Sequence, residues 1–457
     1  MRGTTLFRRK KWGLLHFYEG ILYFCTSICA MYRHISKAIS SWKSDPQRKP
    51  LIIQGARQVG KTWIMKDFGK THFEQVVYVN FESSVRLQSI FKDDFSIPRI
   101  ISILEIESGQ KINAPTTLLI LDEIQEAEKG LTALKYFYET APEYYVIAAG
   151  SLLGVSLQKN NTFPVGKVDF LNLYPLSFDE FLINLKEENL VTAIQEKNWE
   201  LLQVFHEKLT QYLRLYYFIG GMPEVVQAYI SRQDLKQVRV LQNKILLGYE
   251  NDFAKYAPLA ILPKIRMVWQ TILAQLAKEN SKFMYGQLKK GARAKDFEDA
   301  INWLINAGML LKSNLVSKPA IPLKAYANFD AFKLYLLDVG LLNAMGEIDE
   351  QILLNKNQIL QEFKGALTEQ YVAQSLKVSY HLQYWASETA TAEIDFLIQK
   401  NQQIIPIEVK AEENLKSKSL KVFEDKYQTT QALRFSMSAH RKETWLENIP
   451  LYGVFGV

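Results

Sequence analysis

Residues 55–62 combine the residue types and spacing that could bind a polyphosphate. They are Gly-Ala-Arg-Gln-Val-Gly-Lys-Thr, which fits G-x-x-x-x-G-K-[ST], and the apolar segment 51–53 precedes them. Glycines allow a tight loop whose backbone N–H groups point inward at phosphate oxygens. The N-terminus of a following helix adds its positive dipole end to the same anion. The pattern predicts a nucleotide-binding loop between a buried strand and a helix, rather than an ordinary glycine-containing turn.

The residues of this loop predict ATP and Mg²⁺ as cofactors. Lys61 can reach the β- and γ-phosphates, and the Thr62 hydroxyl can ligate Mg²⁺. The residues expected to contact the cofactor are Gly55, Ala56, Arg57, Gln58, Val59, Gly60, Lys61, Thr62 and Trp63.

Two carboxylates, Asp122 and Glu123, follow a second apolar run at residues 117–121. A buried parallel strand presents such side chains at its carboxyl edge. We expect Asp122 to hold Mg²⁺ through its water shell and Glu123 to orient and deprotonate the attacking water. A solvated acidic turn after a strand is the alternative.

A third apolar run, residues 145–149, ends at Gly150 and Ser151. Ser151 is expected either to contribute to catalysis beside the phosphate or to cap the next helix, and the sequence does not separate the two. Residues 76–82 predict a further strand. Strands that alternate with helical stretches predict an α/β fold, with a parallel sheet covered by helices on both faces.

Composition leaves room for two or three domains in the 457 residues. The formal net charge is +7, but the first thirty residues hold five basic residues and one acidic residue, so they contribute +4 and leave +3. The total charge is therefore weak evidence for nucleic-acid binding. Both cysteines also lie in that stretch, so the rest of the chain uses neither disulfides nor cysteine-ligated zinc.

Residues 1–30 resemble a signal or anchor segment, because a basic start precedes the apolar stretch 20–25. The apolar part is interrupted and short for a membrane span. We interpret residues 1–30 as the product of an upstream start choice with no role in the fold, and Met31 as the initiator. A membrane-associating segment is the alternative. The protein is expected to be cytoplasmic, with no membrane partner.

The middle of the chain is expected to be mostly helical. Ser177 and Glu180 form a capping-box pattern, and residues 220–223 signal a turn. Helical patterns at 265–277 and 294–306, followed by a β-wing, predict a winged helix-turn-helix. The basic residues Lys289, Lys290, Arg293 and Lys295 favour DNA binding. A protein-docking module is the alternative, since Asp296, Glu298 and Asp299 offset that charge.

A second chemical signal lies near the C-terminus. Residues 392–398 and 404–410 predict a hairpin, and a period of two places Glu408 and Lys410 on one face with Asp395 on the adjacent strand. Asp…Glu-x-Lys is the constellation of restriction-endonuclease-like nucleases, in which carboxylates hold Mg²⁺ and the lysine activates water or stabilises charge. A preceding helix would add Glu369. The alternative is a surface that binds nucleic acid or a partner and does not cut.

Over residues 31–457 the chain resembles a family of prokaryotic AAA+ P-loop ATPases with a winged-helix linker and a C-terminal PD-(D/E)xK domain of unassigned function. The resemblance rests on residues 55–62, 121–125, 149–151, 163–168, 220–224, 332–342, 363–369, 393–396 and 407–410. It implies that Ser151 contacts the γ-phosphate or the lytic water. Family members commonly have Gly-Arg where this chain has Gly166-Lys167. Lysine keeps the charge but loses the bidentate fork, which leaves catalysis on a neighbour's nucleotide in doubt.

The expected organisation is a P-loop NTPase core with added modules. Residues 1–30 form the extension, 31–180 the AAA+ core, 181–260 a helical lid, 261–330 the winged helix-turn-helix, and 331–457 the endonuclease-like α/β domain. The expected function is hydrolysis of ATP with Mg²⁺, coupled to DNA binding or processing by the C-terminal domain. The expected partners are DNA and further copies of the chain in a homo-oligomer. The alternative is a nucleotide-dependent switch or scaffold that binds a protein partner and has no nuclease activity.

Overall fold

The computed structural model describes residues 31–151, 153–156, 164–277, 282–350, 361–389, 391–411 and 417–457. The chain divides into two units, Met1–Tyr32 and Arg33–Val457, and the second is described below. The predicted extension over residues 1–30 lies outside the described residues. Within the described ranges, no helix has the length and apolar character needed to cross a membrane.

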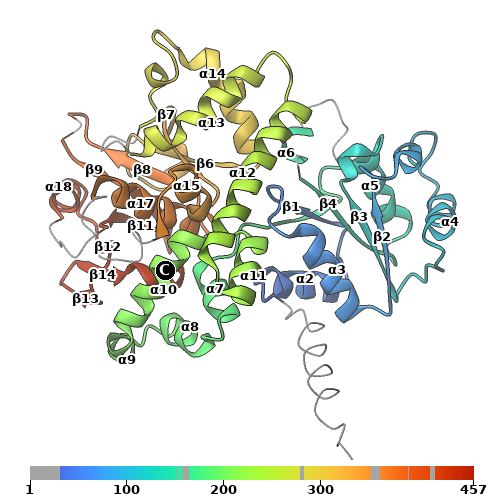
Figure 1. The fold of residues 1–457 in the computed structure, drawn as a ribbon, viewed down its shortest axis with the longest axis horizontal. Helices are drawn as coiled ribbons and strands as arrows, with labels where there is room; N and C mark the ends of the chain where they lie inside the picture. The colour runs from blue at the N-terminus through green and yellow to red at the C-terminus, as the bar shows by residue number, and fades with distance from the viewer. Residues whose placement is uncertain are drawn as a thin grey trace, which may run out of the picture. The chain divides into compact units, whose positions relative to one another are not determined.

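A parallel sheet of five strands forms the N-terminal part of this unit, in the order β2-β3-β4-β1-β5 (Figure 1). Its strands are β1 (Leu51–Gln54), β2 (Gln75–Asn80), β3 (Thr117–Asp122), β4 (Tyr145–Gly150) and β5 (Asp169–Asn172). Its helices are α2 (Ile35–Ser44), α3 (Lys61–His72), α4 (Ile97–Ser108), α5 (Gly130–Thr140) and α6 (Leu153–Ser156), with short 3-10 turns η1 (Val85–Ser89) and η2 (Ile124–Glu126). The predicted α/β class, with a P-loop NTPase core, is confirmed.

The strand sequences explain the position of the site. All six residues of β3 are buried, as expected for a central parallel strand that is covered on both faces. Because β1, β3 and β4 run parallel, their carboxyl ends meet at one edge of the sheet. That edge carries the loop after Gln54, the carboxylate of Asp122, and Ser151.

A helical region follows the sheet: α7 (Phe178–Asn184), α8 (Glu188–Gln195), α9 (Trp199–Val204), α10 (His206–Ile219), α11 (Pro223–Arg232) and α12 (Leu235–Tyr256). The capping box forms, since the Ser177 N–H donates to Glu180 Oε2 at 3.0 Å. The turn before α11 needs glycine, because Gly220 has φ +74° and a Cβ there would lie 2.2 Å from Asp338 Oδ1. The predicted boundary at residue 180 falls inside α7.

The predicted winged module differs from the structure in two ways. Between α13 (Leu262–Leu276) and α14 (Ala294–Asn306), the described residues form only the 3-10 turn η3 (Tyr285–Gln287) and no third α-helix. The wing is not a separate hairpin, because β6 (Leu310–Val316) pairs antiparallel with β7 (Ala327–Leu336) and parallel with β8 (Gln383–Ala386). Only the first four residues of β7 are partly or fully exposed, and the other six are buried, so the predicted boundary at residue 330 falls inside a core strand.

The C-terminal part contains two sheets, β7-β6-β8-β9 and β10-β11-β12-β14-β13. The single strand predicted over 392–398 is wrong. The backbone breaks at Asp395, so that β9 (Glu393–Ile394) pairs with β8 and β10 (Phe396–Lys400) pairs with β11 (Gln403–Val409). The break arises because the Asp395 side chain, not its backbone, accepts the Val409 N–H at 2.7 Å. The remaining elements are η4 (Leu323–Tyr326), α15 (Val339–Met345), α17 (Gln361–Lys377), α18 (Lys418–Tyr427), β12 (Ala432–Ser436), β13 (Arg441–Lys442), β14 (Leu446–Pro450) and η6 (Leu451–Gly456).

Candidate active site

The loop between β1 and α3 is folded tightly around its glycines. Gln58 and Gly60 have left-handed φ angles of 65° and 93°, which let the chain reverse direction before α3. A Cβ on Gly55 would lie 2.2 Å from the Leu173 carbonyl oxygen, so only glycine allows the end of β5 to approach this closely. The loop is therefore shaped by its sequence and is held from outside by β5.

Lys61 is the first residue of α3, and its ammonium group lies within the loop. Its Nζ donates to the carbonyl oxygens of Gly55 at 2.9 Å and Ala56 at 2.7 Å. Burial lowers the pKa of Lys61 to about 8, while the negative charges of Glu123 and Asp122 oppose that shift. The cation is thus held by weak neutral acceptors and is available to an anion that enters the loop.

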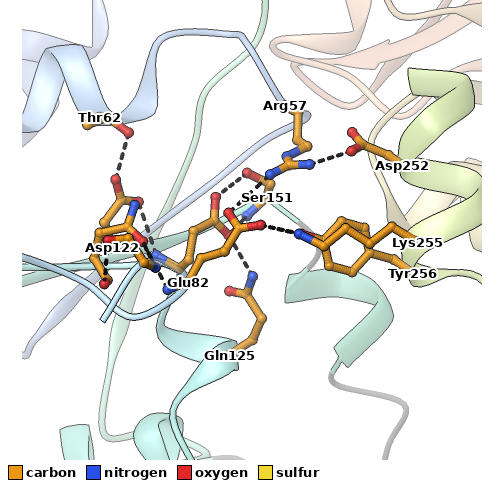
Figure 2. Close-up of polar contacts among 12 residues, drawn as sticks. Arg57, Thr62, Glu82, Asp122, Gln125, Ser151, Asp252, Lys255 and Tyr256 are labelled. Atoms are coloured by element: carbon orange, nitrogen blue, oxygen red, sulfur yellow. Dashed lines mark hydrogen bonds and ion pairs between the residues drawn. The ribbon is translucent and has the colours of Figure 1, made fainter. Parts of the chain in front are cut away.

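Asp122 and Thr62 come together as the spacing predicts. Thr62 Oγ1 donates to Asp122 Oδ2 at 2.6 Å, and burial raises the pKa of Asp122 (Figure 2). A third residue, Tyr78, also donates to Asp122 Oδ2, at 3.0 Å. Burial raises the pKa of Tyr78 to about 12, which keeps the phenol protonated as a donor. A hydroxyl beside a carboxylate is a donor set that suits Mg²⁺, so these residues fit that ion.

Glu123 is fixed by three hydrogen bonds at the end of β3. Ser151 donates its hydroxyl to Glu123 Oε1 at 2.6 Å and its N–H to Oε2 at 3.1 Å, and Gln125 Nε2 donates to Oε2 at 2.6 Å (Figure 2). Glu123 itself has a left-handed φ of 50°. A Cβ on Gly150 would lie 2.0 Å from Gln125 Oε1, so a larger residue there would displace the Gln125 side chain that donates to Glu123. Ser151 therefore bonds the carboxylate that is expected to activate water.

The other loop residues lie around this centre. Ala56 and Val59 are buried, and the Val59 carbonyl accepts a hydrogen bond from Arg33 Nη1 at 3.1 Å. Trp63 lies half-buried in the first turn of α3. Arg33 was not expected from the sequence, since an arginine ahead of the first helix carries no motif. Lys167 pairs with Glu139 of its own chain at 2.9 Å.

Arg57, in the middle of the loop, makes the contacts least expected from the sequence. Its guanidinium bonds Asp252 of α12 and Glu82 after β2, the latter at 3.3 Å (Figure 2). Glu82 also accepts hydrogen bonds from Lys255 and Tyr256 of α12. Asp252 lies 195 positions after Arg57, and no local pattern links the two.

The C-terminal carboxylates divide into two groups. Glu369 and Asp395 lie close enough for the Glu369 charge to raise the pKa of Asp395, to which burial contributes most. Glu408 instead pairs with Lys410, at 2.7 Å. Together these effects raise the pKa of Asp395 to about 8.

A buried lysine occupies the centre of the first group. Lys333 Nζ lies 3.0 Å from Glu369 Oε1 and 2.6 Å from Glu393 Oε1, and the lysine side chain is fully buried. Tyr335 also donates to Glu369 Oε1. Lys333 and Glu393 were missed, although both lie in segments that carry the family resemblance.

A lysine ammonium lies among the predicted nuclease residues. Among the residues that the structure describes, no group of three or more His, Cys, Asp or Glu side chains could hold a metal ion. The Lys333 ammonium pairs with Glu369 and Glu393, so the lysine and a cation would compete for those two carboxylates.

Three family models match parts of the chain. Residues 47–182 match an AAA domain. Residues 210–352 and 364–452 match two domains of unknown function, DUF8612 and DUF4143. No curated protein matches the chain.

Three solved structures that match this chain share little sequence with it. The Walker-type ATPase PABY2304 of Pyrococcus abyssi is 14% identical, with a TM-score of 0.44, over 69% of this chain and 96% of its own. The Aeropyrum pernix ORC1 protein in complex with DNA is 11% identical, with a TM-score of 0.29, over 68% and 90%. Cdc6p from Pyrobaculum aerophilum is 11% identical, with a TM-score of 0.26, over 72% and 96%. We infer no role from these three structures.

Proposed function

We propose that the AAA domain over residues 47–182 binds ATP with Mg²⁺ and hydrolyses it. The observation that carries this proposal is the convergence of three groups at one sheet edge: the Lys61 ammonium, the Thr62–Asp122 pair, and the Glu123 carboxylate held by Ser151. They supply a cation that binds phosphate, a donor set for Mg²⁺ and an oriented base. Phosphoryl transfer to water requires these three parts.

Each residue has a defined part in this reaction. Lys61 binds the phosphate chain, and its pKa of about 8 keeps most of the ammonium charged at neutral pH. The Thr62 hydroxyl and Asp122 would hold Mg²⁺, and the ion would supply positive charge to the phosphate oxygens. Glu123 accepts the proton of the attacking water, and the hydrogen bonds from Ser151 and Gln125 fix the direction of its lone pairs.

Two substitutions test the assignment. Lys61→Ala should lose tight ATP binding, because no other residue of α3's first turn carries a positive charge. Glu123→Gln should bind ATP and hydrolyse it at least about 100-fold more slowly, the usual contribution of a general base. Lys70→Ala and Glu128→Gln, on exposed positions of the same segments, are the matched controls. Normal turnover by both Lys61→Ala and Glu123→Gln would refute the assignment.

For the C-terminal half we propose nucleotide-dependent binding of DNA. Four exposed basic residues between η3 and the first turn of α14 support this proposal: Lys289, Lys290, Arg293 and Lys295. Neutralising phosphates releases counterions, so binding should weaken steeply as salt rises. The measurement is ATPase rate and DNA affinity at several salt concentrations, with Lys289→Ala and Lys290→Ala combined. DNA affinity unchanged by that double substitution would count against this surface.

A second candidate is a nucleotide-dependent switch or scaffold that binds a protein partner and cuts nothing. The Lys333 ammonium between Glu369 and Glu393 favours this candidate over a nuclease, because a metal ion and the lysine would compete for the same oxygens. Incubating the protein with plasmid DNA and Mg²⁺ or Mn²⁺, beside Asp395→Ala, separates the two. Cleavage by the wild type that is lost in Asp395→Ala would show that the C-terminal domain is a nuclease.

The remaining organisation is part of the same proposal. We place the AAA+ core at 31–180, a helical lid at 181–260, a winged-helix-like module at 261–330 and an endonuclease-like domain at 331–457, in a cytoplasmic protein that can assemble with copies of itself. The order of helices and sheets along the chain supports this succession of modules, whereas the limits at residues 180 and 330 fall inside α7 and β7. Size-exclusion chromatography with light scattering, with and without ATP, measures the assembly.

A further inference from the structure

Arg57 belongs to the nucleotide loop, yet its guanidinium is bound outside the loop. It bonds Asp252 on α12 and Glu82, two residues after β2. Its Cζ atom lies 5.4 Å from the centroid of the Tyr256 ring (Figure 2). The Tyr249 hydroxyl donates to the Arg57 carbonyl at 2.9 Å. Both the backbone and the side chain of this loop residue are therefore held by one helix.

The helix α12 packs through buried aromatic side chains against α13 and α14. Tyr249 and Phe253 of α12 pack edge-on against Trp269 of α13, at 6.1 Å and 5.3 Å between ring centroids. Phe253 also packs against Trp303 of α14, at 5.7 Å. All these aromatic side chains are buried. A displacement at Asp252 would consequently be passed to α13 and α14, because close-packed side chains do not deform continuously.

The charges around Arg57 balance only without a bound anion. Arg57 and Lys255 carry two positive charges, and Glu82 and Asp252 carry two formal negative charges. Arg57 is itself a residue of the nucleotide loop, four positions before Lys61. A triphosphate offers a planar guanidinium the same bidentate geometry as a carboxylate, at higher charge. Asp252 and a terminal phosphate therefore compete for one guanidinium.

We propose that Arg57 exchanges partners, binding Asp252 when the nucleotide loop is empty and the terminal phosphate when ATP is bound. When a triphosphate is bound, the release of Asp252 then frees α12 to move, and α13 and α14 move with it because they pack on it. ADP lacks the terminal phosphate and leaves the Arg57–Asp252 contact in place. This inference rests on the proposed function, because it assigns the part of the ATP site that distinguishes ATP from ADP.

The test compares ATP and ADP affinities in matched variants. Asp252→Asn keeps the shape and removes the competing charge, so ATP binding should tighten about tenfold, or about 1.4 kcal/mol, with ADP binding unchanged. Arg57→Ala should weaken ATP binding about tenfold and ADP binding little. In the Arg57→Ala background, Asp252→Asn should no longer change ATP affinity. Glu250→Gln, an exposed carboxylate on the same helix, is the control.

Hydrogen exchange gives a second readout that a purely structural role would not change. In the wild type, a non-hydrolysable ATP analogue with Mg²⁺ should speed exchange in residues 245–257, and ADP should not. This difference should disappear in Arg57→Ala. A wild type that binds ATP, but whose ratio of ADP to ATP affinity equals that of Arg57→Ala, overturns the inference alone. A wild type that binds no ATP overturns the proposed function itself.

Discussion

Replacing Lys333 with methionine would remove the only positive charge that the structure shows within hydrogen-bonding distance of Glu369 and Glu393. The wild-type ammonium lies 3.0 Å and 2.6 Å from their Oε1 atoms and is fully buried. Methionine keeps an unbranched chain of similar volume, so the substitution changes charge far more than packing. The variant therefore isolates what the lysine does for the carboxylate cluster.

The expected loss follows from burial and charge. Removing one partner of a buried ion pair costs about 3–5 kcal/mol. The lower end applies, because 19% of the Glu369 side chain and 26% of Glu393 remain exposed to solvent. Asp395 adds little, since its pKa of about 8 keeps it mostly protonated at pH 7. We expect a loss of about 3 kcal/mol in the free energy of unfolding, seen as a lower urea midpoint at an unchanged slope.

The pH dependence of this loss has a definite sign. The cluster raises the pKa of Lys333, so its stabilisation is complete below the unfolded value of about 10.4 and is lost only above it. The difference between wild type and variant should therefore be constant from about pH 7 to 9 and shrink only as Lys333 loses its proton above about pH 10.4.

The assay is urea unfolding of wild type, Lys333→Met and Lys312→Met, each with and without Mn²⁺. Lys312 lies on the neighbouring strand opposite Leu334 and is half-buried over the Phe332 ring, so it matches the position without the carboxylates. Mn²⁺ should stabilise Lys333→Met more than the wild type or Lys312→Met, because only in Lys333→Met are Glu369 and Glu393 free to bind a cation, whereas the Thr62–Asp122 pair is the same in all three. Equal losses in the two variants, or an equal Mn²⁺ stabilisation of all three proteins, would refute the reasoning.

Two further predictions concern Asp395 and Gly308. Burial raises the pKa of Asp395 to about 8, so the folded protein keeps a proton that the unfolded chain releases above about pH 3.9, and stability should fall as pH rises between these values. Asp395→Asn should remove this dependence and be more stable than wild type at pH 9, which urea midpoints measure; parallel pH profiles would contradict the assignment. Gly308 has φ +75°, and a Cβ there would lie 3.1 Å from the Ala56 nitrogen, so Gly308→Ala should lose about 1–2 kcal/mol and weaken nucleotide binding. Gly109 has φ +67° with open space around a Cβ, so Gly109→Ala should lose only the free energy of unfolding that the left-handed backbone costs an alanine. Its nucleotide affinity should be unchanged.

The sequence predicts the core of the nucleotide site because its parts are encoded locally. A loop of fixed spacing follows β1, and carboxylates follow β3, so the parallel sheet brings Lys61, Asp122 and Glu123 to one edge. The only long-range information needed was that the strands run parallel in one sheet, with β4 between β1 and β3. Alternating strands and helices already imply the parallel sheet.

One C-terminal prediction failed where a local pattern was taken for a continuous strand. Period two correctly placed Glu408 near Lys410, which pair at 2.7 Å. It also predicted one continuous strand through Asp395, although the backbone breaks there and joins two sheets. The pairing partners of β9 and β10 lie on different segments, and no periodicity within residues 392–398 specifies them.

By itself, then, the sequence determined the phosphate loop, its carboxylates and the α/β class, since each depends on neighbours within a few positions or on the rules of parallel sheets. Only the tertiary structure decided which side chains balance the buried charges. Arg57 meets Asp252 across 195 positions, and Lys333 meets Glu393 across 60. The physical reason is that a buried charge needs a counter-charge but does not specify where along the chain it comes from, and packing alone makes that choice.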